Sequence, residues 1–544
     1  MGRTFTARGF WPIVGLLLVI FASPVHAQRR TTQAPAYSSE VSTFLRQAEQ
    51  LEGEQRWGEA LSIYEKALRE FPNEPMLDSR RTLAKIHYDL GRRYGDSSFL
   101  QSVSTLNEHD ALALYSEVLL KIESHYVTSP DWAMLVNRGT RHLQVALGEA
   151  RFRQQHLRGK SPDQINTFAA QLRRLEQSHR IQTRQQALDM VNSTVGWGRQ
   201  MLSLPPAAIT MEFACSAIGA LDNYSSYLTS DQLTDVYSQI EGNFVGLGIE
   251  LKAGDAGLQI VKVISGSPAE RSGIRAGDHI TSVDGQSTID LSTDDAADLL
   301  QGREGSIVEL TTTTPAGVAR RLRVRREHVE VPSVDDVRMI DPEYGVGYLK
   351  LTCFQKTTSR DLDAALWRLH REGMRSLVID LRGNPGGLLT SSVEVADKFV
   401  EGGIIVSTRG RSSLEDYNYT AHKAGTWRVP LVLLIDGDSA SASEILAGAI
   451  RDHRRGDLVG ERSYGKGSVQ GIFPLTLARS GVRLTTAKFY SPNGHPISNV
   501  GVKPDITVHT TARPVGANVA DLGGPDDKVL GAGVQAARRH VAKR

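Results

Sequence analysis

The chain has 544 residues, of which 23% are charged, and its 63 basic and 61 acidic side chains leave a formal net charge of +2. This length leaves room for about three domains, and the balanced charge argues against a surface that binds nucleic acid. Neither the two cysteines, Cys215 and Cys353, nor the histidines show the spacing of a metal site. We expect no metal or other cofactor, and two buried thiols, although export would permit a disulfide.

The first residues have the pattern of a signal peptide. Arg3 and Arg8 precede an apolar run over residues 10–22, and small residues precede a cleavage position after Ala27. The run is shorter than the roughly 20 residues that a membrane-spanning helix needs. We predict a signal peptide over residues 1–27 and export to the periplasm or the extracytoplasmic face of the cell envelope, with membrane contact peripheral at most. An uncleaved membrane anchor is the alternative.

Residues 28–210 have the pattern of helices with one polar face and lack strand signals. The window 41–73 has the spacing of one tetratricopeptide repeat, in which small residues let two helices pack closely and a proline ends the second. The residues with this spacing are Ala48, Ala60, Tyr64, Ala67 and Pro72. Because a single repeat cannot bury a continuous core, we favour a helical adaptor or self-association region over a peptide-binding repeat array.

A strand-rich segment, residues 232–328, follows, and near its start a glycine-rich run separates two apolar segments. The segment resembles a PDZ domain of the circularly permuted bacterial type. In PDZ domains such a run offers backbone N–H groups to the C-terminal carboxylate of a peptide, which adds as an extra strand. The resemblance implies that Gly246, Leu247, Gly248 and Ile249 form this loop, and that a helix over 294–300 faces it with Ala296, Leu299 and Leu300 as pocket wall. A small β domain without a ligand is the alternative.

Strand-like and helical patterns alternate over residues 329–510, which indicates an α/β domain. The strand-like runs cover 345–351, 377–382 and 431–435, and a helical pattern covers 362–372. The segment 511–544 is rich in glycine and alanine and ends in a basic stretch near Arg538. We predict a C-terminal tail there, with a short helix at its end.

The most informative segment joins the strand-like run that ends at Ile435 to a helical pattern from Glu444 onward. Between them lie small residues, and Ser441 is the middle one of three serines. At a helix N terminus the backbone N–H groups have no intrahelical partners, so together with the helix dipole they can stabilise a developing oxyanion. Because small-residue runs are also common as helix caps, this pattern alone does not establish a nucleophile.

A lysine flanked by glycines, Lys466, follows in the sequence and could serve as the base. An amine accepts a proton only when neutral, so its pKa must fall from about 10.4 through burial or cationic neighbours. Residues 460–466 also have the spacing of a phosphate-binding loop, but Gly467 stands where Ser or Thr would bind the metal ion. A trypsin-like role for Ser439 is likewise disfavoured, because Ala440 replaces a glycine of that motif.

Together these segments resemble the C-terminal processing peptidases, also called tail-specific proteases. Residues 439–444 correspond to the Ser-Ala-Ser-Ala-Ser-Glu signature of that family, and residues 465–470 to its Gly-Lys-Gly-x-Val-Gln box. The resemblance implies that Ser441 is the nucleophile, that Lys466 is its base and that Gln470 orients the lysine.

The segment 380–387 resembles the Asp-Leu-Arg-x-Asn-x-Gly-Gly motif of the same family. The resemblance implies that one oxyanion donor is the backbone N–H of Ala442 and that the other comes from Gly386 or Gly387, a choice that stays open. The likeness covers roughly residues 220–508, and residues 211–231 are expected to begin the protease core.

The sequence thus predicts a multidomain α/β protein with an N-terminal helical region and a PDZ domain inserted in or preceding a tail-specific protease core. The implied function is an exported serine endopeptidase with a Ser441/Lys466 dyad, whose substrates are proteins or peptides with apolar C termini. A catalytically inactive adaptor and a hydrolase of small esters or amides are the alternatives. A hydrolase of small esters or amides would leave the PDZ domain without a function.

Overall fold

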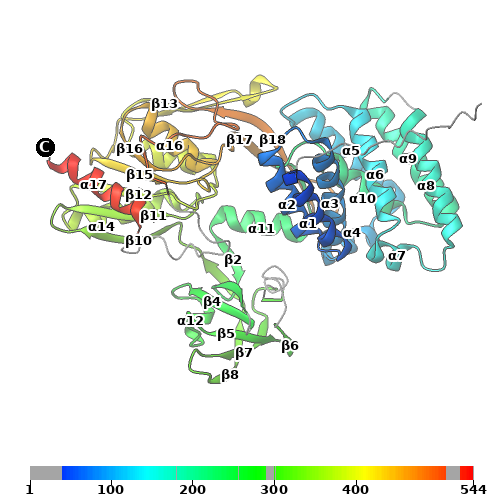
Figure 1. Cartoon of the computed structure of the whole chain (residues 1–544), viewed down its shortest axis with the longest axis horizontal. Coiled ribbons are helices and arrows are strands. Elements are labelled where there is room, and N and C mark those ends of the chain that lie inside the picture. The colour runs from blue at the N-terminus through cyan, green and yellow to red at the C-terminus, as the bar shows by residue number, and fades with distance from the viewer. Residues whose placement is uncertain are drawn as a thin grey trace, which may run out of the picture. The chain divides into compact units, whose positions relative to one another are not determined.

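The computed structural model (Figure 1) describes residues 39–178, 181–254, 257–288, 299–300, 302–509 and 527–542. The predicted signal peptide and most of the predicted helix over 294–300, including Ala296, therefore lie outside the described residues. The chain divides into two compact units, Met1–Tyr88 and Asp89–Arg544. Across the residues described, no helix combines the length and the apolarity needed to cross a membrane.

In the first unit, α1 (Ser39–Gly53) packs against α2 (Trp57–Glu70), and α3 (Pro75–Arg93) begins. The small and aromatic residues with repeat spacing form the contact between the first two helices, since Ala48, Ala60, Tyr64 and Ala67 are fully buried. The helix pair predicted within 41–73 is confirmed, whereas its role in binding a partner stays a prediction.

The second unit begins with further helices. They are α4 (Ser97–Thr105), α5 (Glu108–His125), α6 (Trp132–Ala146), α7 (Ala150–His156), α8 (Pro162–Ser178), α9 (Arg184–Leu202) and α10 (Pro206–Gly219). Helix α10 packs against α5, α6 and α9, and every residue from Ala207 to Ile218 is buried. The predicted boundary at residues 210 and 211 therefore falls inside a helix. The helical region extends to Gly219, because a helix that is buried all round is the centre of a helical core.

A small β domain follows α11 (Ser230–Glu241). Its strands are β2 (Asn243–Gly246), β3 (Ile249–Gly254), β4 (Gly257–Val263), β5 (His279–Val283), β6 (Gln286–Ser287), β7 (Ile307–Thr313), β8 (Ala319–Arg325) and β9 (Glu327–Glu330), with the short helix α12 (Pro268–Arg271). Strand β2 pairs with β9, and the main sheet has the order β3-β4-β5-β7-β8. Strand β3 is therefore an edge strand, which is the kind of strand that a peptide can extend.

The central sheet of the α/β domain has the order β10-β11-β12-β15-β16-β19. Its strands are β10 (Val334–Asp341), β11 (Val346–Leu351), β12 (Ser376–Asp380), β15 (Leu431–Ile435), β16 (Gly456–Gly460) and β19 (Ile506–Thr507). All neighbours are parallel except β10 and β11. Every residue of β12 and β15 is buried, because helices cover both faces of the sheet.

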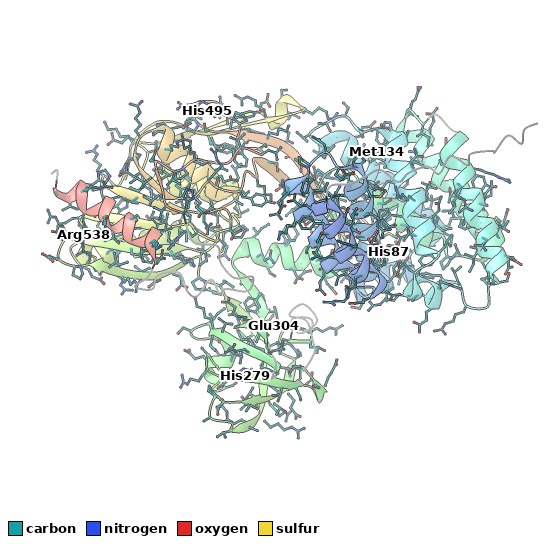
Figure 2. All side chains as sticks on the ribbon, viewed as in Figure 1. His87, Met134, His279, Glu304, His495 and Arg538 are labelled. Atoms are coloured by element: carbon teal, nitrogen blue, oxygen red, sulfur yellow. The ribbon has the colours of Figure 1, made fainter. Side chains whose placement is uncertain are left out.

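One face of this sheet packs on α14 (Thr358–Arg371), α15 (Leu389–Asp397) and α16 (Ala442–Asp452), and the other packs on α17 (Lys528–Ala542). The helix predicted at the end of the C-terminal tail is present as α17, but this part of the chain packs on the sheet and is not a tail outside the core. Val529 and Leu530 of α17 are buried against the sheet with Val432 and Leu434. Arg538 of α17, labelled in Figure 2, forms an ion pair with Asp341 at the end of β10.

A second sheet lies around β18 (Gly481–Tyr490), which pairs with β1 (Ser226–Leu228), β13 (Gly403–Gly410) and β17 (Ser468–Pro474). Strand β14 (Tyr417–Ala421) pairs with β13, and a short 3-10 turn (Ser413–Glu415) connects them. Strands β1 and β17 are far apart in the sequence, but both pair with β18. The segments that precede them, which hold Tyr224 and Lys466, are therefore brought to the same strand.

Candidate active site

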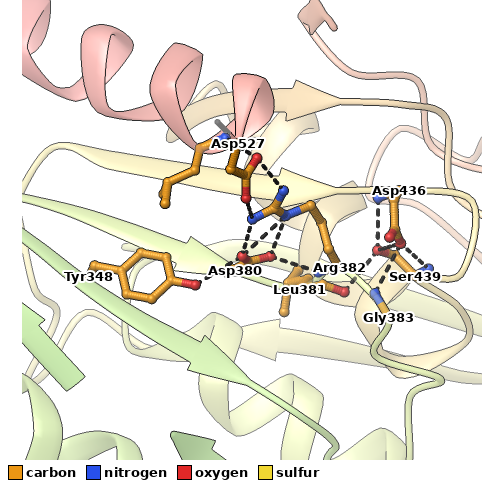
Figure 3. Close-up of polar contacts among 9 residues, drawn as sticks. Tyr348, Asp380, Leu381, Arg382, Gly383, Asp436, Ser439 and Asp527 are labelled. Carbon is orange, nitrogen blue, oxygen red and sulfur yellow. Dashed lines mark hydrogen bonds and ion pairs between the residues drawn. The ribbon is translucent and has the colours of Figure 1, made fainter. Parts of the chain in front are cut away.

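Ser441 lies where the buried strand β15 turns into α16, immediately before the first residue of that helix. Its backbone has φ 55° and ψ −114°, in the left-handed half of conformational space that costs a non-glycine residue about 1–3 kcal/mol. The hydroxyls of the two flanking serines both donate hydrogen bonds to backbone carbonyl groups. Ser439 donates to Leu381 O at 2.8 Å (Figure 3), and Ser443 donates to Asn384 O at 3.0 Å. Within the described residues, the Ser441 hydroxyl donates no hydrogen bond, and its oxygen lies in a capping box with the N–H of Glu444. Of the three serine hydroxyls in the run, that of Ser441 is therefore the one whose proton is not engaged in the described part of the chain.

The loop after β12, residues 383–387, lies directly against this turn, and we call it the oxyanion arm. Gly386 has φ 102°, and a Cβ atom there would come within 2.8 Å of Ala442 N. The N–H of Gly386 donates to Asn384 Oδ1 at 2.8 Å, so it is already used. Among the residues that the structure describes, the N–H groups of Gly387 and Ala442 have no acceptor. This geometry favours Gly387 over Gly386 as the second oxyanion donor.

Glu444 connects Ser441 to the lysine segment, residues 461–467, which we call the lysine arm. Its Oε2 accepts hydrogen bonds from Ser441 N at 2.8 Å and from Lys466 N at 2.9 Å, and its Oε1 accepts from Gly465 N at 2.7 Å and Ser463 Oγ at 2.6 Å. The two nitrogens that share Oε2 lie within two hydrogen-bond lengths of each other. Glu444 therefore sets the distance between the backbones of Ser441 and Lys466.

Sequence reasoning gave Glu444 no role. The available signal was its spacing from Ser441, because an acidic residue three positions after a helix cap commonly accepts the cap's N–H. Its bonds to the lysine arm have no such local signature. The carboxylate is fully buried, and burial raises the pKa of Glu444 while its four hydrogen bonds oppose that effect. The three backbone N–H donors favour the ionised, acceptor-only form of the carboxylate.

The Lys466 amine lies over the ring of Tyr224, with Nζ 4.9 Å from the ring centroid. Burial lowers the pKa of Lys466, the charge of Arg483 lowers it further, and Glu444 and Asp222 act in the opposite direction. Arg483 lies on β18, and its Nε is buried without a hydrogen-bond partner among the described residues. This electrostatic environment favours a neutral amine, as a lysine base requires.

Gln470 lies in β17, just after the lysine arm. Its side-chain nitrogen donates to Ser468 Oγ at 2.9 Å and to Ser468 O at 3.2 Å. No hydrogen bond joins Gln470 or Ser441 to Lys466 Nζ in the described part of the chain. The orientation of Lys466 by Gln470 therefore stays a prediction.

Comparisons with known proteins show the family of the chain. Residues 345–508 match the model of peptidase family S41, and residues 259–313 match that of the PDZ domain. A carboxy-terminal-processing protease of Bartonella bacilliformis is 39% identical over 297 residues, which cover 53% of this chain and 67% of that protein. The chain belongs to the carboxy-terminal-processing proteases of family S41.

A carboxyl-terminal-processing protease of Picosynechococcus is 34% identical to this S41 peptidase over 309 residues, which cover 55% of this chain and 74% of that protein. A solved structure named photosystem II D1 C-terminal processing protease is 26% identical and covers 73% of this chain and 92% of its own. The TM-score of that structure is 0.40. The predicted family, fold class and serine-type peptidase activity are confirmed by the family matches.

In the PDZ domain of this S41 peptidase, the predicted carboxylate-binding loop connects β2 to the edge strand β3. Gly248 has φ 80°, and Leu247 is buried in the core of the domain. Leu300 is buried in the same core and Leu299 packs partly against it. The loop and these two leucines are therefore parts of one packed unit, whereas Ile249 begins the edge strand.

The cysteines of this S41 peptidase are free thiols. Cys215 is buried in α10, and burial raises its pKa to about 12, which makes it a weak nucleophile at neutral pH. Cys353 is only partly buried, so the prediction of two fully buried thiols is wrong for this residue. Within the part of the chain that is described, His, Cys, Asp and Glu side chains form no cluster placed to hold a metal ion.

Proposed function

We propose that this S41 peptidase is an exported endopeptidase that binds protein C termini through its PDZ domain and hydrolyses peptide bonds with Ser441 and Lys466. The observation that supports the dyad most directly is the shared acceptor, Glu444 Oε2, which holds the backbones of both residues. A lysine side chain has four rotatable bonds, so the amine can turn from the Tyr224 ring toward the Ser441 hydroxyl.

In the acylation step, neutral Lys466 accepts the hydroxyl proton while Ser441 Oγ forms a bond to the peptide carbonyl carbon. The carbonyl oxygen becomes an oxyanion that receives hydrogen bonds from the N–H groups of Ala442 and Gly387. The lysine then gives the proton to the departing amine nitrogen as the C–N bond breaks. An acyl-enzyme on Ser441 remains.

In the deacylation step, Lys466 takes a proton from a water molecule that attacks the ester carbonyl. The same two N–H groups stabilise the second oxyanion, and the proton returns to Ser441 Oγ as the C–O bond breaks. The rate should therefore rise with pH as the amine loses its proton. This rise lies below the ordinary lysine value of about 10.4, because burial and Arg483 lower the pKa of Lys466.

Substrate binding is proposed to use the edge strand β3 and the loop before it. A peptide can add to β3 through main-chain hydrogen bonds, and backbone N–H groups of the loop can bind its terminal carboxylate. Leu299 and Leu300 supply apolar surface for the last side chain. Export is inferred from the pattern of residues 1–27, and it predicts a mature protein that begins at Gln28.

The experiment is proteolysis of an unfolded model protein with an apolar C terminus by the wild type, Ser441→Ala and Lys466→Ala. Loss of cleavage in both variants supports the dyad, and cleavage that survives either change contradicts it. The same substrate with a charged C terminus should show a higher KM and a similar kcat if the PDZ domain selects the end. A rate that stays flat from about pH 5 to 9 would contradict a lysine base.

A wild type that binds the apolar C terminus and never cuts it would instead favour the adaptor function. The location is tested separately, by sequencing the N terminus of the mature protein from fractionated cells. A mature chain that still begins at Met1 would contradict cleavage after Ala27.

A further inference from the structure

We propose that Asp527, the residue before α17, is a positioning residue for the oxyanion arm and that it acts through Arg382. This inference rests on the proposed function, because an oxyanion donor matters only if Ser441 attacks a carbonyl. Asp527 lies outside residues 345–508, which match the S41 family model.

The Arg382 side chain is 1% exposed, and one edge of its guanidinium is bound by Asp380. Nε lies 2.9 Å from Asp380 Oδ1, and a terminal nitrogen lies 2.6 Å from Oδ2. The Tyr348 hydroxyl donates to the same Oδ2 at 3.0 Å (Figure 3). Asp380 and Tyr348 lie on neighbouring parallel strands, so this edge of the guanidinium is fixed to the central sheet.

The other edge is bound by Asp527. Its two carboxylate oxygens each lie 2.8 Å from a terminal nitrogen of Arg382, and its side chain is 6% exposed. Asp527 Oδ1 also accepts a hydrogen bond from Leu530 N at 3.0 Å, so the same carboxylate caps α17. The Asp527 side chain therefore both caps α17 and holds Arg382 in place.

Arg382 leads directly into the oxyanion arm. The next N–H, that of Gly383, donates to Asp436 Oδ1 at 3.0 Å (Figure 3), and Asn384 Nδ2 donates to Leu351 O at 2.9 Å. Asn384 Oδ1 in turn holds Gly386 N. A shift of Arg382 is thus transmitted through a short hydrogen-bonded loop to Gly387, whose N–H must be placed within a few tenths of an ångström of its optimum.

Loss of the Asp527 carboxylate leaves guanidinium N–H groups buried without an anionic acceptor, a state that costs more than exposure to water. We expect Arg382 to move toward other acceptors and to move the start of the oxyanion arm with it. Because substrate capture by the PDZ domain does not involve this arm, the change should lower kcat and leave KM close to the wild-type value.

The experiment compares Asp527→Asn with Arg538→Gln, which breaks the ion pair between α17 and Asp341 at the other end of the helix. Both variants weaken the docking of α17, and only the first touches Arg382. We expect kcat to fall about tenfold or more in Asp527→Asn and less than twofold in Arg538→Gln, at matched loss of Tm. Asp527→Glu, which keeps the charge, should recover part of the lost kcat.

Equal kcat values in Asp527→Asn and Arg538→Gln would overturn the proposal, as would a rise in KM with unchanged kcat. If Asp527→Asn does not fold, Asp527→Glu replaces it in the same comparison; its kcat should still lie below that of Arg538→Gln, by a smaller factor because the charge is kept, and equal kcat values would overturn the proposal. Ser441→Ala is measured in parallel. If wild-type cleavage does not depend on Ser441, the proposed function fails and this inference fails with it; Ser441-dependent cleavage with normal kcat in Asp527→Asn refutes this inference alone.

Discussion

The lysine arm and the oxyanion arm lie on either side of Ser441, and they are held in different ways. The lysine arm is fixed from within the catalytic domain, because Glu444 in the first turn of α16 accepts the N–H groups of Gly465 and Lys466. The oxyanion arm is held within the domain by Asp436 and Leu351, and Arg382, the residue before it, is also bound by Asp527, which lies outside the segment that matches the family model. The lysine arm is therefore held within the catalytic domain alone, whereas we propose that the oxyanion arm depends also on the C-terminal helix.

Of the changes that test this difference between the two arms, Glu444→Gln is expected to lower kcat most, because it removes the carboxylate that holds the lysine arm. In the wild type, each carboxylate oxygen of Glu444 accepts hydrogen bonds from N–H groups. A glutamine replaces one of these oxygens with an NH₂ group, so either Ser441 N or Gly465 N loses its acceptor. We expect kcat to fall by about 10²-fold or more, as for other losses of site geometry, with KM nearly unchanged.

Steady-state kinetics on the unfolded substrate measure this effect. Ser463→Ala is the matched control, because it removes one of the four donors to Glu444 and leaves the three backbone donors in place. A kcat for Glu444→Gln that is no lower than that for Ser463→Ala would show that the lysine arm keeps its place without the carboxylate.

An intermediate effect is expected from Gly386→Ala, which disturbs the oxyanion arm without touching α17. The new Cβ would lie 2.7 Å from Ala440 O and 2.8 Å from Ser441 Cβ, at a φ of 102°. Such a conformation is strained for any side chain, at a cost of about 1–3 kcal/mol. We expect kcat to fall by roughly tenfold and Tm to fall with it.

Gly402→Ala is the control for that substitution, because a Cβ there meets no atom within 4 Å. Kinetics and thermal unfolding of both variants check the prediction. Retention of full kcat by Gly386→Ala would mean that the oxyanion arm can withdraw from Ser441 without loss of rate.

The smallest effect is expected from Arg483→Met, which tests the electrostatics of the lysine arm. Removal of the positive charge beside Lys466 should raise the pKa of the amine, since Arg483 now lowers it. A higher pKa keeps the amine protonated to higher pH, so the rising part of the pH–rate profile should move to higher pH with little change in the plateau.

Lys488→Gln, an exposed position on the same strand β18, is the control for net charge. Its pH–rate profile should match that of the wild type. A profile of Arg483→Met that does not move, or that moves to lower pH, would contradict the assignment of this part of the profile to Lys466.

Local patterns were sufficient for much of the fold. The strands β12 and β15 and the turn into α16 were readable because buried parallel strands are continuous apolar runs and a helix has its own period. The tetratricopeptide spacing likewise predicted the pair α1 and α2. The boundary at residue 210 was wrong because α10 is buried on all sides, and such a helix shows no change of pattern where one domain passes into the next.

The sequence by itself therefore determined the family, the order of its domains and the residues to examine, because each of these is encoded in short motifs. Only the tertiary structure decided which of Gly386 and Gly387 keeps a free N–H among the described residues, that Glu444 joins the backbones of Ser441 and Lys466, and that α17 covers the second face of the sheet. The reason is physical: Arg382 and Asp527 are 145 residues apart, and a hydrogen bond across that distance leaves no periodic or local trace in the chain.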